Sequence, residues 1–333
     1  MPLEIRELSP EEAPAVFQAC GERPGAVWRW LAASPGGWRC LGLFQGSALR
    51  AGVVAVAQRV LANGAEARMA EILAAFESAP RPGLRRGGPY VQVLRSLFEV
   101  PPFEVHGPEE HAGRERALAY TWRPSPREWG LAKKLLDCEI VRTETLLVRA
   151  VDEGTREPPP AAETPAIESI ERFDHQARWL FDRCAGDFGA SVIRDDAFLN
   201  WRFVDHPVVR YRILGVRDGQ GILRGYAALG QTKGVLEIVD WLVPPQESAV
   251  GEALLEALLA VAQRSGVLSV RALQPDWAPW FDMFQRRGFR VLDSGRFVAA
   301  RTFARRLDDL WLRDRWWYTG ADFVGPVSSN VGR

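Results

Sequence analysis

The sequence predicts an α/β (α+β) fold made of two similar halves, each with a sheet flanked by helices. The chain has 333 residues, 47% of them apolar and 25% charged, which is long for one soluble domain and favours two. Strand patterns alternate with helical patterns in both halves. Between the halves, residues 151–168 contain three consecutive prolines and several acids, which is typical of a stiff linker.

The first half, residues 1–150, opens with a strand at Leu3–Leu8 and a helix at Ser9-Pro10-Glu11-Glu12, where a cap, a proline and early acids favour a helix start. A helix with an apolar face of Val91, Leu94 and Leu97 begins at Pro89 and ends before Pro101-Pro102. Another is expected from about Pro126 to Leu136. The other strands are expected at Arg39–Phe44, Ala51–Val60, Met69–Phe76, Ala117–Trp122 and Glu139–Arg149.

The second half, residues 169–305, repeats this order. A helix is expected at Glu247–Arg264, with Gly266 just beyond its end, and another at Trp277–Arg287. Strands are expected at Tyr211–Val216, Gly225–Gly230, Val235–Val243, Leu268–Leu273, Phe289–Leu292 and Arg296–Arg301. The extension 306–333 holds three tryptophans and a tyrosine, so we expect it to pack on the body of the protein.

Charge and composition exclude several classes of protein. Lys+Arg and Asp+Glu both number 42, and a balanced charge argues against nucleic-acid or membrane-surface binding. The four cysteines form no CxxC pair, and the start lacks the features of a signal peptide. We therefore expect a cytoplasmic protein, a monomer or homodimer. His106 and His111 lie in a Glu-rich loop without other ligands at helical spacing, so we expect no metal.

The stretch from Arg81 to Gly88 is the strongest candidate for a binding loop. It follows a strand, precedes a helix, and contains arginines without any acid. Glycines allow backbone N–H groups to approach a ligand closely, and a helix N-terminus adds unpaired donors. The loop is therefore suited to a phosphate or pyrophosphate, although an ordinary exposed loop has the same composition.

This order of elements, with Arg85-Arg86-Gly87-Gly88-Pro89-Tyr90 between strand and helix, resembles the GNAT acetyltransferase superfamily. The second half resembles a tandem bacterial subgroup of it, in the strings Arg194-Asp195, Leu199-Asn200-Trp201-Arg202-Phe203, His206-Pro207 with Tyr211, Ile238-Val239-Asp240 and Arg287-Gly288-Phe289. The resemblance covers residues 3–305. It implies two GNAT-like domains, each a mixed, mostly antiparallel twisted sheet flanked by helices.

The resemblance also implies an acetyl-CoA or another acyl-CoA as co-substrate, with no metal. We assign its site to the first half, because the corresponding loop Val243–Ala249 has two prolines without N–H groups and one acid. The residues expected to bind the cofactor are Phe76, Ser78, Arg85, Arg86, Gly87, Gly88, Tyr90 and Ser125. Ser125 is also suited to capping the helix after it.

Acyl transfer to an amine needs a group that takes the amine proton. Glu71, on the strand that enters the loop, is similar in place to the glutamate base of many GNAT enzymes. Glu77 is a second candidate, and by strand alternation we expect the two to share a face, opposite Ile72 and Phe76. A solvent-facing strand residue is the plain alternative for both.

The resemblance therefore implies an N-acyltransferase that acts on a small amine, amino sugar or peptide by direct transfer. Lys133 and Phe284 stand where the family has a thiol-protonating tyrosine, which leaves open a degenerate pair that binds a ligand or partner protein without turnover. Lys133 could act only if burial lowered its pKa. An aminoacyl-tRNA-dependent peptidyl transferase is a further alternative, although the neutral charge offers no footprint for tRNA.

Overall fold

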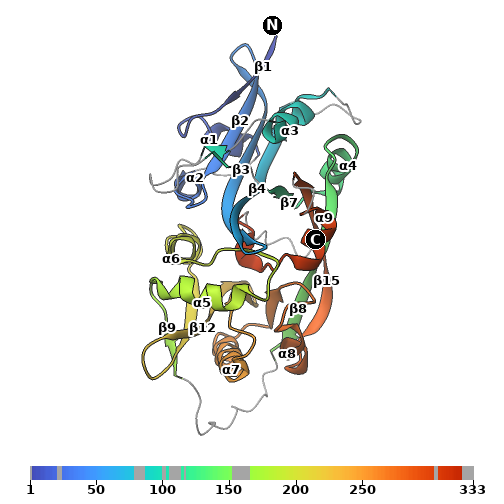
Figure 1. Cartoon of the computed structure of the whole chain (residues 1–333). Helices are drawn as coiled ribbons and strands as arrows, with labels where there is room; N and C mark the ends of the chain where they lie inside the picture. Colours follow the sequence, from blue (N-terminus) through green and yellow to red (C-terminus); the bar gives the residue numbers. More distant parts are fainter. Residues whose placement is uncertain are drawn as a thin grey trace. The chain divides into compact units, whose positions relative to one another are not determined.

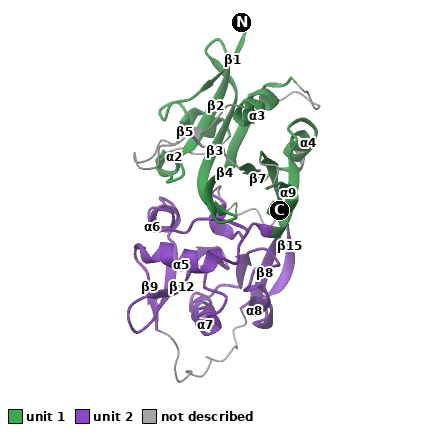
Figure 2. Ribbon diagram, in the orientation of Figure 1, with its two compact units in different colours: residues 1–143, 296–314 green, residues 144–295, 315–333 purple. Residues whose placement is uncertain are grey.

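A computed structural model describes residues 2–20, 25–78, 87–99, 103–104, 114–115, 118–151, 166–303 and 307–324. The chain divides into two compact units (Figure 2): unit 1 comprises residues 1–143 and 296–314, and unit 2 comprises 144–295 and 315–333. Each unit thus takes a segment from the other half of the chain, which the sequential division into 1–150 and 169–305 did not anticipate. Most of the expected linker, residues 152–165, lies outside the described residues.

The sheet of unit 1 has the strand order β1-β2-β3-β4-β7-β15 (Figure 1). All neighbouring strands in this order are antiparallel except β4 and β7, which are parallel. The strands are β1 (Leu3–Glu7), β2 (Trp38–Gln45), β3 (Ala48–Ala62), β4 (Ala65–Glu77), β7 (Ala119–Trp122) and β15 (Arg290–Thr302). A separate small pair joins β5 (Phe103–Glu104) to β6 (Arg114–Glu115).

Helix α3 (Pro89–Glu99) buries the predicted apolar face of Val91, Leu94 and Leu97. These side chains share one core cluster with Val53 and Ala55 of β3. β3 is buried on both faces, which explains its continuous run of small and β-branched residues. The other helices of unit 1 are α1 (Pro14–Ala19), α2 (Gly25–Ala32), α4 (Pro126–Leu135) and α9 (Asp309–Arg315).

The sheet of unit 2 repeats the plan in the order β8-β14-β13-β12-β11-β9, with β13 and β14 parallel. Its strands are β8 (Glu139–Ala150), β14 (Ser269–Leu273), β13 (Val235–Leu242), β12 (Leu223–Thr232), β11 (Arg212–Arg217) and β9 (Ile167–Ser169). The remaining elements are α5 (Gln176–Ala185), β10 (Ala190–Val192), α6 (Asp196–Leu199), a π-helical turn (Asn200–Val204), α7 (Ser248–Arg264), α8 (Phe281–Arg286) and a 3₁₀ turn (Gly320–Asp322).

The last strand of each half completes the other unit's sheet. β8 ends the first half of the chain, yet its residues Leu146–Ala150 pair with β14 of unit 2. β15 ends the second half, yet Ala299–Thr302 pair with β7 of unit 1. The mixed, mostly antiparallel sheets expected from the sequence are confirmed, and this exchange of strands is the feature added by the structure.

Residues 315–324 of the C-terminal extension pack into unit 2, whereas residues 307–314 belong to unit 1. Trp316, Trp317 and Tyr318 are at most 2% exposed, and the Trp317 ring stacks on Phe188. The Trp317 amide donates to the Ala190 carbonyl at 2.8 Å, which fixes the backbone as well. None of the helices in the described ranges has the length and apolar character needed to cross a membrane.

Candidate active site

The candidate site lies where the parallel strands β4 and β7 stop pairing. Their ladder joins Met69–Glu71 to Ala119–Thr121, and β4 then continues to Glu77 whereas β7 ends at Trp122. In the described part of the chain, no further strand pairs with this edge of β4. Its backbone donors and acceptors therefore remain for a ligand, at the carboxyl ends of parallel strands where open α/β sheets commonly bind one.

A β-bulge interrupts β4 at this point. The register with β3 shifts between Val54 and Ala55, which leaves Leu73 of β4 without a direct partner. An extra residue reverses the alternation of side chains beyond it. The pattern of faces expected from simple alternation is therefore wrong after Leu73.

The bulge places Glu71 and Glu77 on opposite faces of the sheet, not on one. Glu71 pairs with Val56 and Glu77 with Ala51, five residues apart along β3. Ala51 belongs to the core beneath α3, so Glu77 lies on the α3 side. Phe76, which pairs with Gly52, lies on the face of Glu71 rather than opposite to it.

Glu71 is the better placed of the two carboxylates. It is 4% exposed, and it pairs across the strands with Thr121, which is 5% exposed. The Thr121 hydroxyl donates to the Ala70 carbonyl at 3.4 Å. Two buried polar side chains thus flank the point where the strands part. Ser78 is exposed just beyond the end of β4, and its amide donates to the Arg50 carbonyl.

The described part of the candidate phosphate loop is Gly87-Gly88, directly before α3. The Gln92 side chain donates to the Gly87 carbonyl at 2.6 Å and so orients this segment. A Cβ built on Gly87 would meet no atom within 4 Å, which leaves room beside the backbone for a ligand. Arg81, Arg85 and Arg86 lie outside the described residues, as do His106 and His111, so their roles stay predictions.

A hydrogen-bonded box joins the first turns of α3 and α4. Ser125 caps α4, since its hydroxyl accepts from the Glu128 amide at 3.4 Å and the Glu128 side chain accepts from the Ser125 amide at 2.7 Å. The buried Tyr90 donates its hydroxyl to Glu128 at 3.2 Å. The capping role predicted for Ser125 is confirmed. Cofactor contacts from Ser125 and Tyr90 stay predictions.

The two positions where the resemblance led us to expect a tyrosine, Lys133 and Phe284, differ in their burial. Lys133 is exposed on α4, with its ammonium 5.8 Å from the Trp129 ring centre. Phe284 is fully buried in the core of unit 2. The structure therefore offers no obvious thiol acid at either position.

Unit 2 repeats the geometry of the strands but fills the site. β13 pairs with β14 as far as Ile238, and its own bulge follows at Val239. The Trp280 indole donates to the Val243 carbonyl at 2.9 Å, immediately before Pro244-Pro245. Its ring lies against Gly251 of α7, because a Cβ built there would be 2.8 Å from it. The Trp280 indole thus lies between the end of β13 and α7.

The bulge in β13 also corrects the expected position of Asp240. Strict alternation along β13 would place Asp240 on one face with both Ile238 and Leu242. Asp240 pairs with Ala228, and Leu242 pairs with Tyr226 on the same face. Ile238 pairs with Leu229 and points to the other face, into the core beneath α7.

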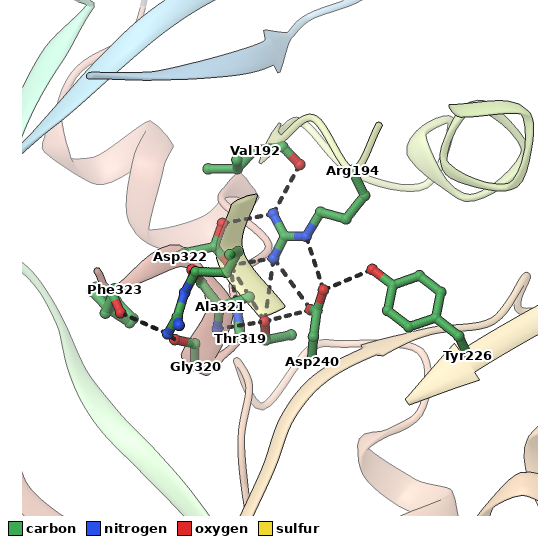
Figure 3. Close-up of polar contacts among 10 residues, drawn as sticks. Val192, Arg194, Tyr226, Asp240, Thr319, Gly320, Ala321, Asp322 and Phe323 are labelled. Carbon is green, nitrogen blue, oxygen red and sulfur yellow. Dashed lines mark hydrogen bonds and ion pairs between the residues drawn. The ribbon is translucent and has the colours of Figure 1, made fainter. Parts of the chain in front are cut away.

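The distinctive polar residues of the second half form a buried cluster (Figure 3). Arg194 is fully buried and donates to the carboxylates of Asp240 and Asp322. Arg202, 1% exposed, donates to the Tyr211 hydroxyl at 2.9 Å and to backbone carbonyls of the C-terminal extension. Neither this cluster nor the pairing of Arg194 with Asp322, which lies 128 residues away, was predicted from the sequence.

Two local contacts fix the backbone in this region. Asp195 caps α6, since its side chain accepts from the Phe198 amide at 2.9 Å. His206 fixes the turn at Pro207, since its Nδ1 accepts from the amides of Val208 and Val209 at 3.2 and 3.0 Å. Burial, together with nearby Arg202, lowers the pKa of His206 to about 4.

Solved structures share this fold over most of the chain. A protein from Enterococcus faecalis V583, described as a probable N-acyltransferase, matches with a TM-score of 0.60 and 14% identity over 94% of this chain and 74% of its own. Yeast N-myristoyltransferase with bound myristoyl-CoA matches with a TM-score of 0.53 and 13% identity, over 90% of this chain and 78% of its own. A tandem GNAT protein from the clavulanic acid biosynthesis pathway matches with a TM-score of 0.51 and 15% identity, over 90% of this chain and 98% of its own. No family model and no curated protein matches the sequence.

Proposed function

Since the chain has a tandem GNAT fold, we propose that it is an acyl-CoA-dependent N-acyltransferase with its site in unit 1. The observation that carries this proposal is the contrast between the two units. In unit 1 the edge of β4 beyond Glu71 has no paired strand in the described residues, and Gly87-Gly88 leads into α3. In unit 2 the corresponding place holds Trp280, and two prolines precede α7.

Each part of an acyl-CoA has a matching element in unit 1. The amides of its pantetheine arm can pair with the β4 edge as an added strand would. Its phosphates suit the N-terminus of α3, with Arg85 and Arg86 as the arginines that the sequence supplies nearby. One solved neighbour carries myristoyl-CoA, so we keep the co-substrate as an acyl-CoA, with acetyl-CoA the first to test.

In the proposed reaction, the amine nitrogen of a small molecule or peptide attacks the thioester carbonyl. A carbon–nitrogen bond forms, the carbon–sulfur bond breaks, and the CoA thiolate leaves and takes up a proton. Glu71 accepts the proton that the amine loses, directly or through a water. Backbone N–H groups near Leu73 stabilise the oxyanion that develops on the carbonyl. No covalent enzyme intermediate forms.

Calorimetry with acetyl-CoA tests the location of the site. We expect one molecule bound per chain, and binding lost in the double variant Arg85→Ala with Arg86→Ala. The matched control is Arg183→Ala with Arg224→Ala, which removes the two arginines that pair with Glu247 before α7. If the control pair weakens binding and the first pair does not, the assignment to unit 1 is wrong.

The two carboxylates can be separated by kinetics. Loss of a general base costs on the order of 10²–10⁴-fold in rate. We expect Glu71→Gln to lower kcat by about this factor while leaving acetyl-CoA binding unchanged. Glu77→Gln, on the opposite face of the sheet, should lower kcat by less than about threefold, within the range of weak surface effects. The reverse result would assign the base to Glu77.

The absence of a thiol acid at Lys133 and Phe284 favours a second candidate function, ligand binding without turnover. Free thiol released with a panel of amines distinguishes the two. Thiol release that depends on Glu71 supports the enzyme. Tight acetyl-CoA binding with no thiol release from any amine supports the non-catalytic protein.

A further inference from the structure

In unit 2, a segment of the C-terminal extension packs against the bulge of β13. This C-terminal segment, Thr319–Phe323, lies beside Asp240 (Figure 3). Its Gly320 also approaches Val239 closely. A Cβ built on Gly320 would lie 3.1 Å from the Val239 carbonyl oxygen, so glycine permits the close approach. In unit 1, the corresponding place on β4 is the edge proposed above for acyl transfer.

Two buried arginines bind the C-terminal segment. Arg194 holds the Asp322 carboxylate with two parallel bonds, at 2.7 Å from Nη1 and 2.5 Å from Nη2. A planar guanidinium suits this two-point contact, which fixes orientation as well as position. Arg202 donates to three backbone carbonyls of the segment, those of Gly320, Ala321 and Phe323. The segment is therefore held by its backbone and by a charged side chain.

Asp240 joins the segment to the strand. It accepts from the Thr319 hydroxyl at 2.7 Å and from the Tyr226 hydroxyl at 2.7 Å. Arg194 donates to both of its oxygens at 3.4 Å. Burial opposes the charge of Arg194, but Asp240 and Asp322 raise its pKa above the usual value, so the guanidinium stays charged.

We propose that this face of unit 2 is a peptide-binding site whose ligand is the chain's own C-terminal segment. The site recognises three features of a tight turn. Asp240 accepts a hydrogen bond from a hydroxyl, and Arg194 binds a carboxylate three residues later. Arg202 donates to three backbone carbonyls of the turn. Buried charges are costly unless they are paired, so Arg194, Arg202 and Asp240 form a site that requires an occupant. Unit 2 thus keeps a ligand position on β13 but uses it to hold the chain itself.

The first test displaces the segment in the full chain. Gly320→Val places a branched side chain against Val239, while Arg194, Arg202 and Asp240 are unchanged. A capped synthetic peptide of residues 317–324 should then bind in trans and raise the Tm of this variant, but not that of wild type, whose site is filled. A peptide with valine in place of Thr319 should bind about ten- to a hundredfold more weakly. A variant with faster hydrogen exchange at residues 317–324 that fails to bind the peptide overturns the proposal.

The second test needs no displacement and decides the matter if Gly320→Val does not fold. Thr319→Val removes the hydroxyl that donates a hydrogen bond to Asp240. Amide hydrogen exchange of residues 317–324 should therefore accelerate by about tenfold or more relative to α7. Thr232→Val, at an exposed position on β12, is the matched control and should change nothing. Unchanged exchange, or equal acceleration throughout unit 2, contradicts the proposal.

Discussion

At the scale of single residues, His206 makes a prediction about pH. Its Nδ1 accepts two backbone N–H bonds, which protonation would break. Burial lowers its folded pKa to about 4, from 6.5, so between these values the folded state binds fewer protons than the unfolded chain. The contribution of His206 to the free energy of unfolding is therefore full above about pH 6.5 and is lost as pH falls towards 4.

Urea unfolding at a series of pH values measures this contribution by difference, since carboxylates also titrate in the range. His206→Asn keeps an oxygen that can accept from the following amides but takes up no proton. We expect the stability of this variant to fall less steeply than that of wild type between pH 6.5 and 4. Parallel curves for His206→Asn and wild type would exclude His206 as a source of the dependence.

Local rules apply to residues whose partners are near in sequence. Ser125 caps its helix through Glu128, Asp195 through Phe198, and each pair is three residues apart. The partners of Arg194 were out of reach of such rules, since Asp322 lies 128 residues away and only the folded chain brings them together. The same holds for Glu71 and Thr121, which meet across two strands.

At the scale of elements, the two β-bulges explain why the bounds of the strands were predicted better than the face of the sheet on which each side chain lies. β4 and β13 both read as ordinary strands, and their bounds agree with the sequence patterns to within a few residues. One unpaired residue in each, Leu73 and Val239, then inverts every side chain beyond it. No composition signal marks either residue, because the bulge is set by pairing with the neighbouring strand.

Trp280 makes a prediction at this scale. Trp280→Phe removes the indole donor and leaves the buried Val243 carbonyl without it, which should destabilise the protein by about 1–3 kcal/mol. It should not create a second acyl-CoA site, because Pro244 and Pro245 still offer no N–H groups. Denaturant unfolding and calorimetry check the two expectations. The control Trp179→Phe, at a position 55% exposed, should change stability by less than about 0.5 kcal/mol. A stoichiometry of two for Trp280→Phe would mean that the indole alone closes unit 2.

At the scale of the whole molecule, the exchanged strands predict how the two halves behave when the chain is cut. Independent domains joined by a linker separate when the linker is cleaved. Here β8 belongs to the N-terminal fragment but pairs with β14, and β15 belongs to the C-terminal fragment but pairs with β7. Cleavage at a protease site inserted within residues 152–165 should therefore leave both fragments eluting together, with the circular dichroism of the intact chain.

Each fragment expressed alone lacks a strand of its sheet and exposes an unpaired edge, so it should be unfolded or aggregate. Fragments that separate under native conditions, or that fold alone, would show that β8 and β15 are dispensable to the sheets they complete.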